Sequence, residues 1–297
     1  MLRSSLHTRT CQTAAARVIE EYSTSFSLAT RLLPPEIRTH VASIYSLVRV
    51  ADEVVDGAFP ASEPEDRVRE LDDLEARVRD AHSRGFSTDA YVHAFAWSAR
   101  STGIGPAQWE PFFDSMRADA HPCVHDEVSL RTYVHGSAEV VGEMCVLAFL
   151  DGAPVGPARR EALFRGARAL GSAFQKVNFL RDLAEDRDDL DRAYLPGIGR
   201  SAPTDTQKAA IVADIRDELD TACGSIGLLP KQVRPAVRLA HDLFEELARA
   251  LDAAPAHRLT HTRIRVPTRR KAVLAVSALV GRRRAPGGGT TIGRGRA

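Results

Sequence analysis

The chain has no strong excess of charge of one sign, since 40 Lys and Arg residues stand against 39 Asp and Glu, a formal net charge of +1. A nucleic-acid-binding domain usually carries a dominant basic footprint, so we expect no nucleic-acid partner. Lysine itself is scarce, and 36 of the 40 basic residues are arginines. We interpret this bias first as a property of the coding sequence and second as a sign of phosphate binding. The lysines are Lys176, Lys208, Lys231 and Lys271.

Cysteine pairs and long apolar runs are also missing. Cys11, Cys123, Cys145 and Cys223 lie far apart without a CxxC pair, which argues against a zinc site or a disulfide framework and favours a reducing cytoplasm. The N-terminus carries arginines but no continuous apolar segment of the kind found in signal peptides. The apolar stretch Ala272–Val280 is much shorter than the roughly 20 residues that span a bilayer. We therefore expect a soluble cytoplasmic protein.

Strand-like alternation is absent, and apolar residues recur three and four positions apart along nearly the whole chain. Proline and glycine interrupt this pattern at short intervals, but no interruption is long enough to be an interdomain linker. A length of 297 residues allows one or two domains, and we favour one all-α domain over residues 1–282. The expected helical segments are 12–30, 36–57, 65–84, 89–103, 106–119, 127–151, 158–190, 205–222, 232–253 and 268–281.

The end of the chain differs in composition from the rest. Residues 281–297, GRRRAPGGGTTIGRGRA, are rich in glycine and arginine and poor in apolar side chains. Such a segment cannot bury enough apolar surface to offset the entropy of ordering. We expect residues 283–297 to be a disordered, basic and glycine-rich tail.

The first segment with a chemical signature is IYSLVRVADEVVDG, residues 44–57. Asp52 and Asp56 are four positions apart and therefore share a helix face. Arg49 lies three positions before Asp52, and Tyr45 lies four positions before Arg49. Valines flank these polar residues, which is unusual for a solvated helix face. The pattern predicts a polar face inside an apolar helix.

The second such segment lies between Gln175 and Asp186. Gln175, Asn178, Asp182 and Asp186 follow one another in steps of three, four and four, which makes one continuous stripe on a helix. Arg181 lies at the edge of this stripe. One acid pair alone is weak evidence because surface helices often contain such pairs. Two of them, each with a companion arginine, favour a common site.

The chemistry of these side chains indicates bound metal and phosphate. Like-charged carboxylates four residues apart destabilise a helix unless a cation lies between them. Ligand sets made only of oxygen suit Mg²⁺, which shares its coordination shell with substrate phosphates. Two facing acidic helices therefore predict a diphosphate held through Mg²⁺, with Arg49 and Arg181 neutralising the same oxygens. A di-iron carboxylate site would need Glu-x-x-His pairs, which neither segment contains.

The order and spacing of the motifs resemble the squalene/phytoene synthase family, and specifically the phytoene synthases of actinobacteria. The resemblance runs from about residue 19 to residue 278. Its landmarks are YSTSF at 22–26, ATRLLP at 29–34, YSLVRVADEVVD at 45–56, MRAD at 116–119, YVHGSA at 133–138 followed by Gly142, FQKVNFLRDLAED at 174–186 and RAYLP at 192–196.

The resemblance implies an isoprenoid-synthase fold, in which helices surround a central apolar cavity and both acid motifs face its mouth. It also implies the head-to-head joining of two allylic diphosphates through a cyclopropylcarbinyl diphosphate. Two to three Mg²⁺ ions would bind with the diphosphate, and Tyr133 would lie near the departing diphosphate. The implied metal ligands are Asp52, Asp56, Asn178, Asp182 and Asp186. The implied substrate-binding residues are Ser23, Ser25, Phe26, Tyr45, Arg49, Gln175, Asn178 and Arg181.

Three departures from the family pattern bear on function. Thr24 stands where the family often has Lys or Arg, so one diphosphate contact is expected to be missing. Phe244 stands where the family commonly has Tyr, which removes a hydroxyl. Glu139 and Glu143 are additional acids, and we expect them to pair with Lys176 because an unpaired buried acid would be costly.

The leading hypothesis is a prenyltransferase that condenses two geranylgeranyl diphosphates to phytoene in carotenoid biosynthesis, without NADPH. One alternative is a squalene or dehydrosqualene synthase that uses C15 substrates. A second is a terpene cyclase, or a prenyltransferase that moves one allylic group onto an aromatic small molecule; Thr24 and Phe244 motivate it. The weakest is a helical scaffold without activity.

The expected partners are allylic isoprenoid diphosphates. Because substrates and product are lipids, peripheral association with the inner face of the membrane is compatible with the sequence. The basic segment Arg263–Lys271 and the tail would provide the contact.

Overall fold

The computed structural model describes residues 5–56, 59, 63–121, 124–183, 192–198, 202–261 and 263–280. Over these residues the chain is helical, and no strand is formed. An isolated bridge joins Val124 to Ala193. The expectation of an all-α fold is confirmed. The expected boundary between residues 282 and 283, and the tail beyond it, lie outside the described residues.

The helices follow the chain without a long irregular segment among the described residues. Their bounds are α1 (Leu6–Tyr22), α2 (Thr24–Thr30), α3 (Pro35–Asp56), α4 (Pro64–Arg84), α5 (Ala90–Thr102), α6 (Pro106–Asp119), α7 (Glu127–Val134), η1 (His135–Glu139), α8 (Val140–Leu150), α9 (Pro157–Arg181), α11 (Asp205–Ile226), α12 (Arg234–Ala253), η2 (Ala256–Thr260) and α13 (Thr268–Val280).

Proline and glycine set several of these helix ends. α4, α6 and α9 begin with proline in the first turn, where its missing N–H is not needed. α4 and α5 end at Gly85 and Gly103, whose φ angles of 77° and 79° lie in the left-handed region that favours glycine. The break expected between the segments 89–103 and 106–119 is confirmed.

Two expected segments are divided differently in the structure. Residues 12–30 form two helices, because Ser23 leaves helical geometry and its side chain accepts a hydrogen bond from the Phe26 amide at the start of α2. The second segment, 158–190, does not continue as one helix, since α9 ends at Arg181 and Asp182 is its C-cap residue. Residues 184–191 lie outside the described residues.

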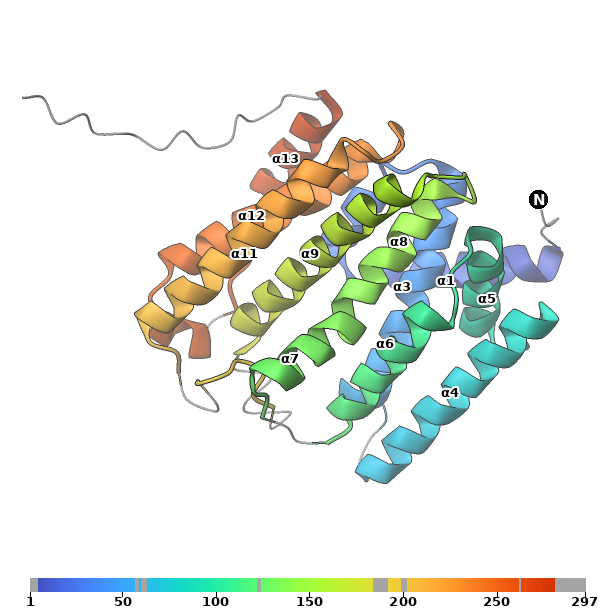
Figure 1. The fold of residues 1–297 in the computed structure, drawn as a ribbon, viewed down its shortest axis with the longest axis horizontal. Helices are drawn as coiled ribbons and strands as arrows, with labels where there is room; N and C mark the ends of the chain where they lie inside the picture. The colour runs from blue at the N-terminus through green and yellow to red at the C-terminus, as the bar shows by residue number, and fades with distance from the viewer. Residues whose placement is uncertain are drawn as a thin grey trace, which may run out of the picture.

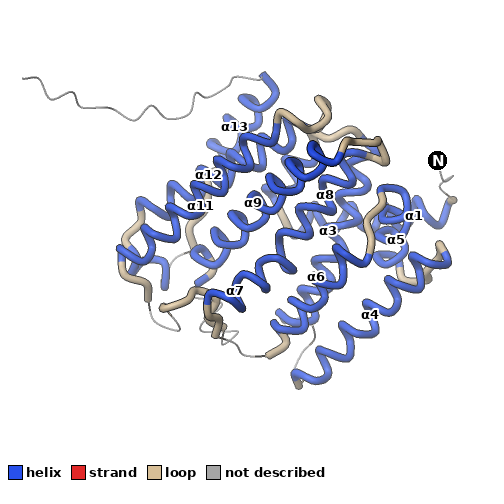
Figure 2. Tube along the Cα trace, in the orientation of Figure 1, coloured by secondary structure: helices blue, strands red, loops and turns tan. Residues whose placement is uncertain are grey.

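The long helices run side by side across the molecule, from α13 at one margin to α4 at the other (Figure 1). α8 and α9 lie between these margins, and α9 packs against both α8 and α11. The loops gather at the two ends of the bundle (Figure 2). One part of the core is built around α3, α5, α6 and α8, and the other around α9, α11 and α12. This arrangement places the C-terminal ends of α3 and α9 on the same side as the starts of α7 and α11.

Partly buried apolar side chains lie on the inner helices and pack against the two core clusters. In a solid bundle such central positions would be closed to solvent, so accessible apolar side chains there are candidates for the wall of the expected cavity. They are Val41 and Val48 on α3, Val141 and Phe149 on α8, and Leu170 and Phe174 on α9.

The helix Glu127–Leu150 combines α7, η1 and α8 and is long and apolar enough to cross a membrane by length and composition alone. However, 61% of its apolar window is buried inside the protein, as in the core helix of a globular fold. Its π-helical turn, His135–Glu139, is of the kind often found near functional sites.

Close backbone contacts clamp this helix between α6 and α9. A Cβ atom added at Gly136 would lie 2.1 Å from the carbonyl oxygen of Pro111 in α6, and one added at Gly171 would lie 2.5 Å from that of Ala138. Both distances are far below van der Waals contact with backbone atoms that cannot move alone. The glycines therefore fix the position of Tyr133, which precedes the π-helical turn.

Gly136→Ala is expected to lower the free energy of unfolding by about 1–3 kcal/mol, because the methyl group would push α6 away. Urea denaturation measures the change. Gly224→Ala is the matched control, since an added Cβ on this exposed turn of α11 meets nothing within 4 Å. It should leave stability unchanged or raise it by up to about 1 kcal/mol. Equal stability of the Gly136 variant and the wild type would contradict the close contact.

Candidate active site

The first acid motif lies on the last two turns of α3. Arg49 donates a hydrogen bond from Nη1 to Asp52 Oδ2 at 3.2 Å and also pairs with Glu53. The guanidinium of Arg49 lies over the ring of Tyr22, 4.6 Å from its centroid. The predicted proximity of Arg49 and Asp52 is therefore present, and Arg49 is held next to the acid face.

The surrounding protein strongly affects the ionisation of Asp52. Desolvation by the surrounding protein, followed by the neighbouring Asp56 carboxylate, raises the pKa of Asp52 to about 7, against the lowering effect of Arg49. Yet 33% of its side chain remains accessible. A residue that is both desolvated and accessible is typical of the wall of an interior recess. A bound cation would relieve the repulsion between the two carboxylates.

The raised pKa predicts how the stability of the metal-free protein depends on pH. A carboxyl group whose folded pKa of about 7 exceeds its unfolded value of roughly 3.9 is a source of stability at low pH. This stability is lost as the pH rises through the folded pKa. Between pH 5 and 8 in EDTA, the melting temperature should fall less in Asp52→Asn than in the wild type. Parallel curves for the two proteins would contradict the assignment.

The second acid motif lies at the end of α9. Arg181 donates to Asp182, with Nε 2.9 Å from Oδ1, and Nε of Arg263 also lies 2.9 Å from Asp182 Oδ1. Oδ1 of Asn178, one turn earlier, is buried and has no hydrogen-bond partner among the described residues. The fifth expected ligand, Asp186, lies outside the described residues.

These residues fit Mg²⁺. A buried amide oxygen without a donor is costly unless a ligand satisfies it, and a cation is one such ligand. Asp52 and Asp56 at the end of α3, and Asn178 and Asp182 at the end of α9 and just after it, each offer oxygen donors of the type that Mg²⁺ prefers.

Three of the expected substrate-binding residues are brought together at the start of α2. Ser23 lies close to Tyr45, whose pKa is raised mainly by burial. The ring of Phe26 lies 6.2 Å from that of Tyr45 and 5.8 Å from those of Phe174 and Phe244, centroid to centroid. The last two rings stack at 3.6 Å. The other two expected residues, Ser25 on α2 and Gln175 on α9, are half-buried.

Tyr133 is buried and bonded to an acid. Its hydroxyl donates to Asp119 Oδ2 at 2.6 Å, and the hydroxyl of Tyr194 donates to the other oxygen at 2.8 Å. Burial raises the pKa of Asp119 to about 6, although Arg192 and the two hydroxyls act in the opposite direction. Burial and the Asp119 charge together raise the pKa of Tyr133 well above its ordinary value.

Arg192 connects this buried acid to the first motif. Its Nη1 lies 2.7 Å from Asp56 Oδ1, and its Nη2 donates to the carbonyl oxygen of Asp119 at 2.7 Å. MRAD and RAYLP are landmarks of the family resemblance, but the sequence alone indicated no role for Asp119, Arg192 or Tyr194. The available signal was the presence of charged residues among apolar neighbours in those two motifs.

A second group that the sequence analysis did not place at the site comes from α13 and the segment before it. Nζ of Lys271 donates to Thr24 Oγ1 at 2.9 Å. Burial, Arg265 and Arg181, in that order, lower the pKa of Lys271, so these cations converge near the start of α2 and the end of α9. An ammonium group therefore stands next to Thr24, where the sequence predicted that a cation would be missing.

The two additional acids are paired, but the expected pairing with Lys176 is wrong. Lys176 on α9 pairs with Glu218 on α11. Glu139 pairs within its own helical segment, and Glu143 on α8 pairs with an arginine on α9. Register between neighbouring helices decides these contacts, and spacing within one helix does not reveal it. The pairs are Lys176–Glu218 (2.8 Å), Glu143–Arg168 (2.6 Å) and Glu139–His135 (2.9 Å).

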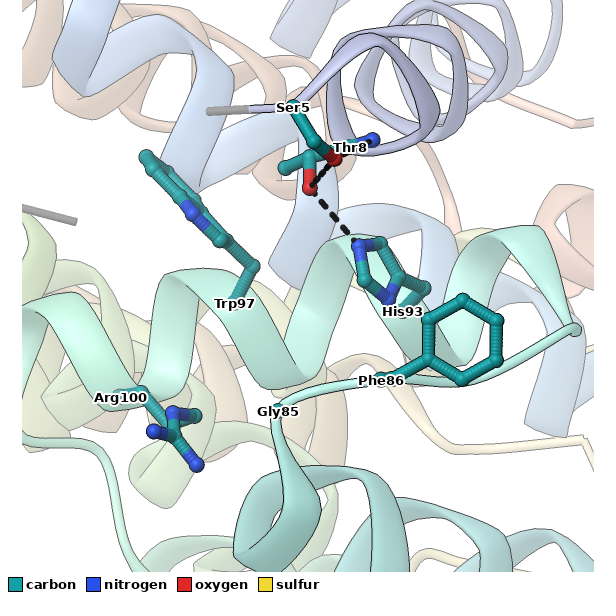
Figure 3. Close-up of a pocket in the computed structure, with 7 residues that line it drawn as sticks. All are labelled: Ser5, Thr8, Gly85, Phe86, His93, Trp97 and Arg100. Atoms are coloured by element: carbon teal, nitrogen blue, oxygen red, sulfur yellow. Dashed lines mark hydrogen bonds between the residues drawn. The ribbon is translucent and has the colours of Figure 1, made fainter. Parts of the chain in front are cut away.

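A cavity of about 210 Å³ lies between α1, the α4–α5 turn and α5 (Figure 3). Nε2 of His93 is 3.0 Å from Thr8 Oγ1, and Nδ1 accepts from the Ser87 amide, so the ring donates through Nε2. Trp97 and Arg100 complete part of its lining. None of the expected site residues lines this cavity.

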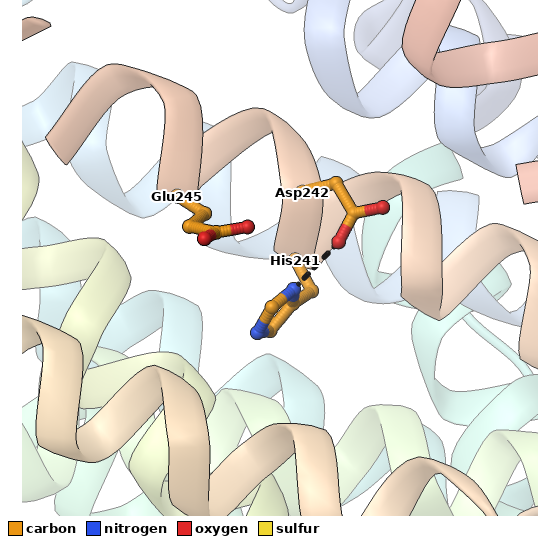
Figure 4. A group of neighbouring side chains, drawn as sticks. All are labelled: His241, Asp242 and Glu245. Carbon is orange, nitrogen blue, oxygen red and sulfur yellow. Dashed lines mark hydrogen bonds and ion pairs between the residues drawn. The ribbon is translucent and has the colours of Figure 1, made fainter. Parts of the chain in front are cut away.

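His241, Asp242 and Glu245 form a compact group on α12, with potential ligand atoms within 4.8 Å of one another (Figure 4). Nδ1 of His241 is 2.8 Å from Asp242 Oδ1, and its Nε2 is 3.1 Å from the carbonyl oxygen of Leu219. Glu245 pairs with Arg249. Each of the three side chains therefore already has a hydrogen-bond or ion-pair partner. We interpret the cluster as a polar contact between α12 and α11.

Comparison with known proteins finds relatives in both sequence and structure. The squalene/phytoene synthase family profile matches residues 19–198. A phytoene synthase of Daucus carota is 34% identical over 182 residues, which cover 60% of this chain and 44% of the relative. A phytoene synthase of Mycobacterium bovis is 32% identical over 179 residues, 57% of this chain and 55% of the relative. The alignment thus spans about half the length of these relatives.

Solved structures show the same fold. A dehydrosqualene synthase crystallised with a ligand superposes with a TM-score of 0.75 over 92% of this chain and 97% of that chain, at 19% identity. The isoprenoid-synthase fold expected from the motifs is confirmed. The family consists of prenyltransferase-type enzymes. Because its profile covers more than half of the sequence, the chain belongs to the squalene/phytoene synthase family.

Proposed function

We propose that the protein condenses two geranylgeranyl diphosphates head to head to give phytoene, through a cyclopropylcarbinyl diphosphate, in an Mg²⁺-dependent reaction of carotenoid biosynthesis without NADPH. The observation that carries the proposal is the presence of cations beside both acid motifs. Arg49 lies beside the acids of α3, while Arg181, Arg263 and Lys271 surround the end of α9 and the start of α2. Two sets of cations suit two diphosphates.

The residues divide into those that hold charge and those that exclude water. Asp52, Asp56, Asn178, Asp182 and Asp186 would hold Mg²⁺, which when bound neutralises the leaving diphosphate. The arginines and Lys271 would bind diphosphate oxygens directly. The apolar side chains of α3, α8 and α9 offer the allylic carbocation a wall without nucleophiles.

Thr24 and Phe244 motivated the alternative hypothesis of transfer to an aromatic acceptor, and both have contacts that account for them without it. Thr24 receives the ammonium group of Lys271. Phe244 stacks on Phe174 at 3.6 Å and so serves the apolar wall. Neither residue now favours an enzyme that uses one allylic diphosphate.

The test is incubation of the purified protein with Mg²⁺ and either geranylgeranyl or farnesyl diphosphate, without NADPH. We expect a C40 hydrocarbon from the first substrate and little product from the second. A C30 product formed in preference would establish the shorter-chain alternative. Prenylation of an added aromatic acceptor without a C40 product would establish single transfer.

We also propose that the enzyme is cytoplasmic and works at the inner membrane face. α13 exposes Val273 and Val276, 53% and 61% accessible, next to the basic segment Arg263–Lys271. The double substitution Val273→Ser/Val276→Ser should weaken binding to anionic vesicles by about tenfold, since each valine would bury roughly half of its surface. Cosedimentation measures binding. Turnover in detergent should be unchanged, and unaltered vesicle binding would show that α13 is not the contact.

A further inference from the structure

Arg192 is held by acceptors on two helices that are distant in sequence. Its side chain is only 4% exposed. Nη1 pairs with Asp56 Oδ1 at 2.7 Å, while Nη2 donates to the carbonyl oxygens of Val55 at 3.0 Å and Asp119 at 2.7 Å. The guanidinium therefore joins the end of α3, where a positive charge is also favoured by the helix dipole, to the end of α6.

The Asp119 carboxylate, like the Arg192 guanidinium, is held in one orientation by several hydrogen bonds. Each of its carboxylate oxygens accepts a hydroxyl, one from Tyr133 and one from Tyr194. The ring of Tyr194 stacks on Phe179 at 4.5 Å and on His125 at 5.7 Å, which prevents the hydroxyl from swinging away. A buried polar network whose members are all satisfied is rigid and holds one arrangement.

The network around Arg192 contacts the first acid motif through Asp56. Asp52 has Arg49 as its partner, and Asp56, one turn further on at the last residue of α3, has Arg192. Each carboxylate thus has its own arginine, which offsets part of the repulsion between the two acids. Of the two arginines, only Arg192 is anchored by backbone carbonyls on two separate helices.

We propose that Arg192 is a positioning residue, which holds the Asp56 carboxylate in the orientation required for Mg²⁺, and that Asp119 with Tyr133 and Tyr194 holds Arg192. The inference rests on the proposed function, because it assigns Arg192 a task toward expected Mg²⁺ ligands. It also gives Tyr133 a role through Asp119, to which its hydroxyl donates a hydrogen bond.

The experiment measures the binding of inorganic pyrophosphate by calorimetry at increasing Mg²⁺ concentration. In Arg192→Lys the charge is kept, but an ammonium group cannot reach all three acceptors. We expect the Mg²⁺ concentration for half-maximal binding to rise about 10- to 100-fold, as for other residues that orient metal ligands. Arg168→Lys is the matched control, because Arg168 also pairs with an inner-helix acid, Glu143, but takes no part in the network. Its Mg²⁺ requirement should equal that of the wild type.

The outcomes separate the two proposals. If the wild type itself shows no Mg²⁺-dependent binding of pyrophosphate, the proposed function fails. If the wild type binds and Arg192→Lys has the same Mg²⁺ requirement, the positioning role is overturned, whatever the turnover. If Arg192→Lys does not fold, Tyr194→Phe decides, since it removes one hydroxyl from Asp119 and keeps the ring. It should raise the Mg²⁺ requirement by about threefold or more, and an unchanged requirement overturns the proposal.

Discussion

Asp52→Asn and Asp182→Asn are each expected to lower the turnover rate about 100- to 1000-fold, roughly 3–4 kcal/mol of transition-state stabilisation. Asparagine preserves the shape of the side chain but removes one negative ligand, so the charge that develops on the departing diphosphate is less well held. Steady-state kinetics at saturating substrate measure the effect. Higher Mg²⁺ should restore part of the activity, because the defect lies in metal affinity.

Both variants should remain folded. The Asp52 substitution should even stabilise the metal-free protein at neutral pH, since it removes one of two adjacent carboxylates. Asp73→Asn is the matched control, because this aspartate is exposed on α4, and its turnover should be normal. Near-normal turnover of Asp182→Asn, or its failure to fold, would show that the second motif is structural.

The acid face of α3 could be predicted because its geometry is local. Four residues make about one helical turn, so the spacing of Asp52 and Asp56 fixes a common face whatever surrounds the helix. The contact between Arg49 and Asp52 follows from the same rule at a spacing of three. These contacts need only the correct assignment of a helix.

The network around Arg192 could not be predicted because its partners are 73 and 136 residues away, at Asp119 and Asp56. No periodicity within one helix encodes such contacts. The contact between Lys271 and Thr24 spans 247 residues and has the same origin. Both depend on how helix ends meet, which is decided by packing of the whole bundle.

The break between α1 and α2 could have been predicted from the sequence. Ser23 precedes Thr24 and Phe26 in a stretch that carries the N-cap signature of a serine before a helical turn, yet continuous apolar periodicity favoured a single segment. The end of α9 was harder, since Asp182 continues the polar stripe in spacing but lies past the last helical residue. Its contact with Arg263 comes from a segment 81 residues later.

Lys271→Met is expected to lower kcat/KM about 10- to 100-fold, because a hydrogen bond to a charged group contributes about 1.5–3 kcal/mol. Methionine keeps the length and the apolar stem of the side chain and removes only the ammonium group. Lys231→Met is the control, since Lys231 is exposed in the loop before α12. Its kinetics should match those of the wild type.

The proximity of Lys271 and Thr24 allows a rescue experiment. The Lys271 ammonium lies 2.9 Å from Thr24 Oγ1, so a lysine placed at position 24 can return a positive charge to the same region. The double variant Lys271→Met/Thr24→Lys should recover most of the lost kcat/KM, because a diphosphate responds to the charge and not to the helix that carries it. Full activity of Lys271→Met alone would exclude a diphosphate contact. A folded double variant as inactive as the single one would show that Lys271 acts by fastening α13 to α2.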